Sequence, residues 1–162
     1  MFFPTAPWPG LLYVMTGFGT VLLLGLTLVL GGQESTRLVA GAPFAVWVLC
    51  AVYMVRGFRL EGQTLYIKRL FQETAIPLQG LEKAEHRPAA LLDARRTLGN
   101  GGLFAFTGHF SNATLGSFRM YATDPALAVT LYLPDRIVVV TPADTTAFLK
   151  AVQHPEPVAV ID

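Results

Sequence analysis

Two long apolar runs fill the first third of the chain. The residues from Leu11 to Leu30 form 20 consecutive positions without a charged side chain, and those from Leu38 to Val55 form 18 more. At 1.5 Å of rise per residue, a helix of about 20 residues spans the roughly 30 Å hydrocarbon core of a bilayer. Because a buried helix of a soluble protein normally keeps a polar stripe, both runs predict transmembrane helices.

The connector between the runs is short and polar. It reads GGQESTR, from Gly31 to Arg37, so the two helices are expected to form an antiparallel transmembrane hairpin. Four basic residues follow the second run, whereas the connector carries one acid and one base, and the positive-inside rule therefore predicts cytoplasmic chain ends. We expect a multi-pass protein of the cell membrane, which contacts membrane lipids through both helices. The basic residues after the second run are Arg56, Arg59, Lys68 and Arg69.

A cleaved signal peptide is the competing interpretation of the first run. The segment before it, Met1 to Gly10, has no Lys or Arg, and the run is longer than the 7 to 15 apolar residues typical of signal peptides. In the second run, Gly41 and Ala45 form a small-xxx-small pair, which suits packing between the two helices or a dimer interface. Neither run contains an ionisable side chain of the kind that lines ion or proton paths, so a channel or transporter is not expected.

Residues 58–153 show a pattern of period two and are expected to form one small domain. A two-residue turn at Gly62-Gln63 precedes the alternating segment Thr64 to Leu70, which predicts a first β-hairpin. The next strand, Phe71 to Leu78, is weaker, and Pro77 suits only a sheet edge or a strand end. Three later segments predict strands arranged as a meander. These segments are 117–123, 127–133 and 136–140.

The end of the domain has a helical pattern. Thr141 is the predicted N-cap, with Pro142 at the first helical position and Asp144 three residues after the cap. Phe148 and Val152 lie four residues apart, so one face of the helix can cover a sheet. The predicted fold class is therefore α+β and mostly β, in which a two-helix transmembrane hairpin precedes an antiparallel β-barrel capped by a C-terminal helix.

Two segments have weaker patterns. The segment from Leu81 to Arg96 fits either a long loop or a short helical turn within residues 89–96. Pro88 restricts the backbone conformation of the residue before it. Residues 154–162 contain two prolines and are expected to form a flexible tail.

Composition agrees with a membrane protein and argues against a nucleic-acid partner. Apolar residues make up 52% of the 162 residues and charged residues 14%, compared with about 25% charged residues in ordinary soluble domains. The net charge is +1 and no basic cluster is present, whereas binding to a phosphate backbone needs several clustered bases. The single cysteine, Cys50, lies in the second apolar run and has no partner for a disulfide.

The stretch from Thr97 to Ala122 is rich in glycine and aromatic residues. It contains neither GxxxxGK[ST] nor a GxGxxG that opens a helix, so it predicts a β-hairpin with glycine bends and not a phosphate-binding loop. Its phenylalanines could stack on bases only beside a basic groove, and His109 has no other metal-ligand residue near it in sequence. No catalytic residue, cofactor or metal site is predicted.

The same stretch and the terminal helix resemble the bacterial PH-like domain family. The resemblance covers roughly Phe58 to Val152, and it implies a PH-like barrel of two near-orthogonal sheets capped by a C-terminal helix, commonly tethered by two transmembrane helices. The first-hairpin turn, Gly62-Gln63, lacks the basic cluster of eukaryotic PH domains that bind phosphoinositides. The matching positions are Gly99, Gly101, Gly108, Phe110, Gly116, Phe118, Tyr121, Ala122, Thr123, Thr141, Pro142, Asp144 and Phe148.

Three functions fit these observations. The favoured one is a non-enzymatic interaction or scaffold module at the cytoplasmic membrane face, which docks a protein partner or associates with itself, because no catalytic motif is present. The second is a membrane-surface sensor, in which the basic residues after the second run touch anionic lipids. The third is a small-ligand site beneath the glycine-rich stretch, where arginines pair with an anion. The candidate arginines for this third function are Arg95, Arg96 and Arg119.

Overall fold

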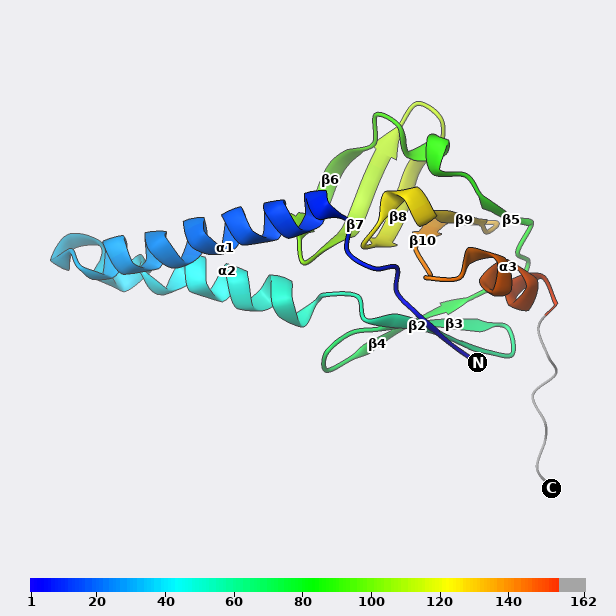
Figure 1. The fold of residues 1–162 in the computed structure, drawn as a ribbon, viewed down its shortest axis with the longest axis horizontal. Helices are drawn as coiled ribbons and strands as arrows, with labels where there is room; N and C mark the ends of the chain where they lie inside the picture. The colour runs from blue at the N-terminus through cyan, green and yellow to red at the C-terminus, as the bar shows by residue number, and fades with distance from the viewer. Residues whose placement is uncertain (155–162) are drawn as a thin grey trace, which may run out of the picture.

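Two apolar helices lead away from the strands. The computed structural model describes residues 1–154, in which α1 (Gly10–Gly31) and α2 (Gly41–Val52) pack side by side and run in opposite directions (Figure 1). A 3-10 helix, η1 (Glu34–Val39), precedes α2. Both α1 and the η1–α2 segment are long and apolar enough to cross a membrane. α1 extends one residue beyond each end of the first apolar run, whereas α2 is shorter than the second run, because η1 takes up its start and the helix ends at Val52.

Four strands form the first sheet, in the order β1-β2-β3-β4. The predicted first hairpin is confirmed by β2 and β3, and β4 lies at the sheet edge, as Pro77 requires. The short strand β1 was not expected, and its pairing with β2 ties the segment before α1 to the domain. The strands are β1 (Phe2–Pro4), β2 (Gly57–Glu61), β3 (Thr64–Lys68) and β4 (Glu73–Pro77).

Six strands form the second sheet, in the order β5-β9-β10-β8-β7-β6. The predicted meander is wrong, because β10 lies between β8 and β9 and runs parallel to β8. A 3-10 helix, η3 (Pro125–Leu127), lies between β8 and β9, and β9 then pairs with β10 from its far side. The strands are β5 (Lys83–His86), β6 (Arg95–Leu103), β7 (Ala105–Asn112), β8 (Gly116–Ala122), β9 (Val129–Tyr132) and β10 (Ile137–Val140).

The segment without a clear sequence pattern is divided between elements. It contains the edge strand β5, a 3-10 helix η2 (Pro88–Leu91) and the start of β6. The sequence allowed either a long loop or a short helical turn here, and the structure has a short helical turn, η2. A flexible tail was predicted at residues 154–162, and residues 155–162 of it lie outside the described part of the chain.

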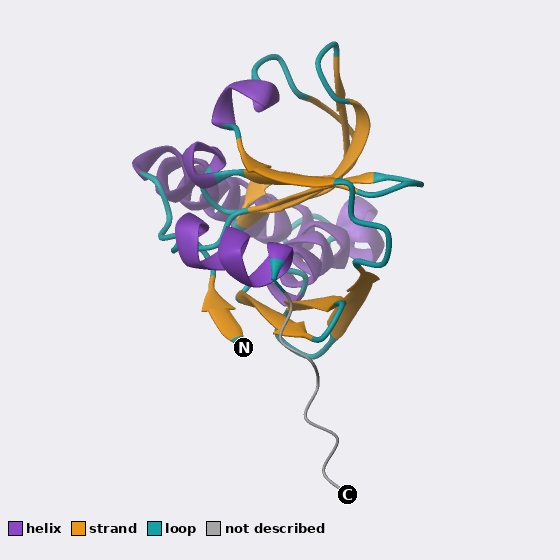
Figure 2. Cartoon of the chain, turned by 90° about the vertical axis from the view of Figure 1, so that its right-hand side faces the viewer, coloured by secondary structure: helices purple, strands orange, loops and turns teal. Residues whose placement is uncertain are grey.

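The main core lies between the two sheets and the C-terminal helix α3 (Thr145–Gln153). Figure 2 shows the sheets as separate layers with a helix between them. Phe148 of α3 is fully buried, and its ring lies edge-on to Phe3 at 5.2 Å and to Phe58 at 6.2 Å between centroids. Within residues 1–154 no strand pairing joins the two sheets, so the strands do not close into the barrel that the sequence predicted.

The start of α3 differs from the prediction. Asp144 is the N-cap, and its carboxylate accepts a hydrogen bond of 2.8 Å from the amide of Ala147. Thr141 cannot act as the cap because its hydroxyl accepts from the amide of Thr123, at 2.9 Å, and its carbonyl accepts from Ala6, at 2.8 Å. The residues before α3 therefore stay extended and pair with the segment before α1.

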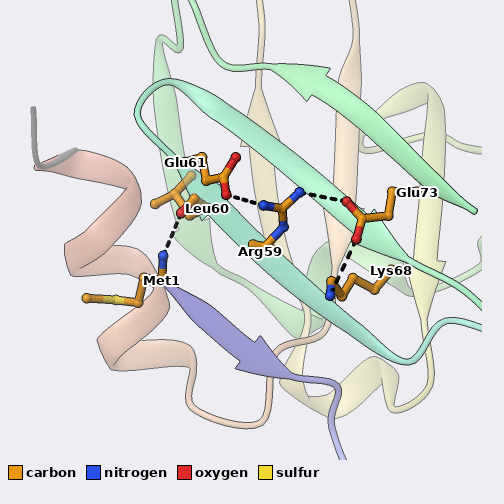
Figure 3. Close-up of polar contacts among 6 residues, drawn as sticks. All are labelled: Met1, Arg59, Leu60, Glu61, Lys68 and Glu73. Atoms are coloured by element: carbon orange, nitrogen blue, oxygen red, sulfur yellow. Dashed lines mark hydrogen bonds and ion pairs between the residues drawn. The ribbon is translucent and has the colours of Figure 1, made fainter. Parts of the chain in front are cut away.

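A small ion cluster joins three strands of the first sheet (Figure 3). Arg59 contacts Glu61 and donates to Glu73 at 2.8 Å, while Lys68 lies 3.4 Å from the other oxygen of Glu73. The amino group of Met1 donates to the carbonyl of Leu60 beside it, at 2.7 Å. The hydrogen bond from Arg59, followed by its charge and that of Lys68, lowers the pKa of Glu73 from its ordinary value of 4.5.

The lowered pKa of Glu73 predicts a small acid sensitivity. A carboxyl whose pKa is depressed by folding adds stability above its unfolded pKa and loses it as the pH falls through the folded pKa. We expect the melting temperatures of the wild type and Glu73→Gln to differ at pH 7 and to converge below about pH 4.5. Glu82→Gln, which removes a carboxylate without an ion pair among the described residues, should change the melting temperature less than Glu73→Gln at pH 7. A difference for Glu73→Gln that stays constant between pH 7 and pH 4 would contradict the assignment.

Candidate functional site

A pair of facing glycines shapes the β6–β7 hairpin. Gly99 and Gly108 lie opposite each other with φ angles of +122° and +130°, a region in which only glycine is comfortable. A Cβ on Gly99 would lie 2.3 Å from the carbonyl oxygen of Thr107, and one on Gly108 would lie 2.2 Å from that of Leu98. The predicted hairpin with glycine bends is confirmed, and its glycines serve close backbone approach.

The tip of this hairpin docks on α1. The amide of Phe104 donates to the hydroxyl of Thr16 at 3.0 Å, and that hydroxyl donates to the carbonyl of Gly102 at 3.4 Å. Leu103 packs so closely on α1 that a Cβ added to Gly19 would lie 2.9 Å from its side chain. Thr16 is accordingly one of only two buried residues of α1, the other being Leu12.

Aromatic rings extend this contact to α2. The ring of Phe104 lies 5.8 Å from that of Trp47 on α2 and 6.2 Å from that of Trp8, measured between centroids. The indole nitrogen of Trp47 donates to the hydroxyl of Thr20 at 3.0 Å, which also joins the two helices. The hairpin tip therefore touches both helices, and the domain is held on them by more than the chain connections.

Beside this contact, α2 and the second sheet enclose a recess of about 620 Å³. This volume lies within the range of roughly 300 to 1,000 Å³ that small-molecule sites occupy. One wall is formed by Val46, Leu49, Cys50 and Tyr53, whose spacing places them on one face of α2. The opposite wall comes from β6, β7 and β8.

The polar side of the recess is basic. Arg69, Arg96 and Arg119 line it together with His109, and no Asp or Glu among residues 1–154 does so. The guanidinium of Arg69 lies 5.2 Å from the ring centroid of Tyr53 and 5.6 Å from that of Tyr121, and its Nε is buried without a hydrogen-bond partner within the described chain. The arrangement can therefore bind an anion.

The seven basic residues singled out from the sequence lie in three different environments. It brings Arg69, Arg96 and Arg119 to the recess, although they come from distant segments. It places Arg59 and Lys68 in the ion cluster of the first sheet. Arg56 and Arg95 are exposed and do not line the recess.

Several residues of the recess were not identified as site residues from the sequence. Tyr53 was only a member of the second apolar run, and Tyr121 only a position of the family motif. His109 was considered as a metal ligand, but within residues 1–154 no group of three potential metal ligands exists. The only sequence signal for the α2 wall was the helical spacing of its apolar residues.

The docking contact yields a prediction for Thr16→Val. The substitution keeps the shape of the side chain but leaves the partly buried amide of Phe104 without its acceptor, which costs about 1 kcal/mol. We expect faster hydrogen exchange at Phe104 and a lower melting temperature. Thr27→Val is the matched control, because the hydroxyl of Thr27 bonds only within α1, to Leu23. Equal effects of the two variants would contradict the docking contact.

Comparison with known families agrees with the resemblance noted from the sequence. The sequence profile of the bacterial PH domain matches residues 56–155, which include β2 to β10 and α3. No curated protein and no solved structure gives a match. The profile covers more than half of the 162 residues and coincides with the C-terminal helix and, apart from β1, with the two sheets. The chain therefore belongs to the bacterial PH domain family.

Proposed function

We propose that this protein is a non-enzymatic membrane sensor, whose PH-like domain binds an anionic ligand in the recess between α2 and the second sheet. The observation that carries the proposal is the unpartnered Arg69, which lies between two tyrosine rings in a basic recess without an acidic residue among those described. A half-buried guanidinium whose Nε is shielded from solvent gains from pairing with an anion, because the lower local dielectric strengthens the interaction.

The proposal includes a membrane topology. α1 and the η1–α2 segment cross the cell membrane as a hairpin, and the domain lies on the cytoplasmic side. Supporting this, the segment before α1 and the segment after α2 both join the first sheet, so the domain lies at one end of the hairpin. The charged residues at the far end of the hairpin are Glu34 and Arg37. At the domain end, Arg56 and Arg59 follow α2, and the positive-inside rule expects such basic residues on the cytoplasmic side.

The sensor takes precedence over the interaction or scaffold role that the sequence favoured. A scaffold would need a surface whose chemistry selects a protein partner or a second copy, whereas the recess already has a defined volume, charge and aromatic frame. A protein partner or self-association thus becomes the second expectation, and it would be recognised by a change of oligomeric state that does not depend on Arg69.

Ligand binding tests the proposal. The full chain in a neutral detergent is heated with inorganic phosphate, with glycerol phosphate or with an anionic phospholipid. At about 100 times its dissociation constant, a ligand of the native state stabilises by roughly 2.7 kcal/mol, so at least one of the three should raise the melting temperature. The increase should be lost in Arg69→Gln. The proposal is wrong if none of the three anions shifts the melting temperature of the wild type.

Cysteine labelling tests the topology. Cys50 is the single cysteine, so Cys50→Ala provides a background in which Gln33→Cys marks the far end of the hairpin and Arg136→Cys marks the domain. In intact cells a membrane-impermeant maleimide should label Gln33→Cys only, and Arg136→Cys should react after lysis. The reverse pattern would overturn the orientation.

A further inference from the structure

We infer that the recess is a binding site for one anionic phospholipid, whose headgroup pairs with the arginines while an acyl chain lies along α2. This inference rests on the proposed function, and it names the ligand class of the same site. A phosphate ester without an acyl chain would offer the same charge, so the source of the anion is the point that must be tested.

The sheet wall of the recess becomes more polar with distance from the hairpin tip. Leu103 is at the tip, Asn100 pairs with Thr107 in the middle, and His109 pairs with Arg119 at the far end. The four residue steps from Ala105 to His109 cover about 13 Å of strand. A lipid has the same order of chemistry, from acyl chain through glycerol esters to phosphate.

The depth of the recess matches the membrane boundary. Leu103 contacts α1 at Gly19, which lies six residues, or about 9 Å, deeper along the helix than Tyr13. Tyr13 is largely exposed, as interfacial aromatic residues of a spanning helix are. The tip of the hairpin therefore lies deeper along α1 than Tyr13, on the side of the acyl chains, whereas Arg69 lies beside Tyr53 at the domain end of α2, toward the headgroup layer that flanks the hydrocarbon core.

The helix wall suits an acyl chain. Val46, Leu49 and Cys50 present a continuous apolar face over the span from Val46 to Tyr53, which is about 10 Å of helix. At the end of this face Arg69 lies between Tyr53 and Tyr121. An apolar face that ends at a fixed guanidinium is complementary to a molecule with a hydrocarbon tail and a phosphate, and less so to a free anion.

Native mass spectrometry of the full chain in neutral detergent separates these cases. The probes are dioleoyl phosphatidylglycerol, dioleoyl phosphatidylcholine with the same chains, and glycerol phosphate without chains. We expect one phosphatidylglycerol to bind in preference to the other two. Arg69→Gln and Arg119→Gln should each weaken that binding by about 10- to 100-fold, as expected for one charged hydrogen bond. Arg56→Gln is the matched control, since Arg56 is exposed and outside the recess, and it should leave binding unchanged.

A variant of the helix wall completes the test. Leu49→Trp fills the apolar side without changing charge, so it should weaken phosphatidylglycerol but not glycerol phosphate. Glycerol phosphate binding as tightly as phosphatidylglycerol would overturn the inference and leave the proposed function intact. Binding of neither would overturn the inference, and the proposed function falls with it when inorganic phosphate also leaves the melting temperature unchanged. Equal binding of both lipids, with the same response to Arg56→Gln and Arg69→Gln, would show general lipid adhesion and also overturn the inference.

Discussion

Gly108→Val is expected to destabilise the domain by roughly 3 to 5 kcal/mol, because it combines a forbidden backbone conformation with a backbone collision. The φ of Gly108 is +130°, and the added Cβ would lie 2.2 Å from the carbonyl oxygen of Leu98. Neither atom can move without separating β6 from β7, and separation removes the sheet wall of the recess. Urea unfolding in mild detergent, followed by far-ultraviolet circular dichroism, measures the loss.

Gly116→Ala separates the two causes. Gly116 also has a positive φ, of +67°, but nothing lies within 4 Å of an added Cβ. The substitution therefore costs only the free energy of holding a non-glycine residue at a positive φ, which is about 1 kcal/mol. If both variants were equally mild, the close approach of β6 and β7 would not exist in the folded protein.

Phe148→Ala is expected to destabilise by about 3 to 5 kcal/mol, as in other large-to-small substitutions of buried phenylalanine. Its ring is fully buried and contacts Phe3 of β1 and Phe58 of β2, so the cavity would open where α3 joins the first sheet. Because that ring packs on Phe3, we also expect faster hydrogen exchange where β1 pairs with β2, at the amides of Phe3 and Phe58, measured by mass spectrometry.

The neighbouring Lys150→Ala is the control for this prediction. Lys150 lies in the same helix but is exposed, and its replacement should change the unfolding free energy by no more than about 0.5 kcal/mol. A similarly small effect of Phe148→Ala would mean that α3 does not cover the core.

Elements encoded by local patterns were predicted from the sequence. The first helix follows from an uninterrupted apolar run, and the β2–β3 hairpin from alternation on both sides of Gly62-Gln63. The buried pair Phe148 and Val152 follows from helical spacing. The bacterial PH-like resemblance rested on the same local motifs, and the family match confirmed it.

Features that depend on distant partners could not be predicted in this way. Thr141 has the sequence of a helix cap, but its hydroxyl and carbonyl are taken by Thr123 and Ala6, which are far away in the chain. The order of β8, β9 and β10 depends on a crossing that no turn residue encodes. Strand β1 has only three residues, which is too few for a periodicity.

The candidate site was the least predictable part. Its arginines follow three different patterns in the sequence, namely a strand end at Arg69, a hairpin edge at Arg96 and an alternating strand at Arg119. The pairing of β6, β7 and β8 brings Arg96 and Arg119 together, and the docking of the β6–β7 tip on α1, in which the hydroxyl of Thr16 takes part, holds that sheet beside the helices. A threonine inside an apolar run gives no sign of such a partner, because it more often bonds within its own helix, as Thr27 does.

The recess exists only if the helices and the domain form one unit. Double electron–electron resonance tests this directly, with spin labels on Leu28→Cys in α1 and Leu98→Cys in β6, in the Cys50→Ala background. Both positions are exposed, at 78% and 71%, so the labels should not disturb packing. We predict one narrow distance distribution centred on the separation in the structure. A broad distribution, as from a domain that moves freely on its connections, would contradict the docked arrangement and the recess with it.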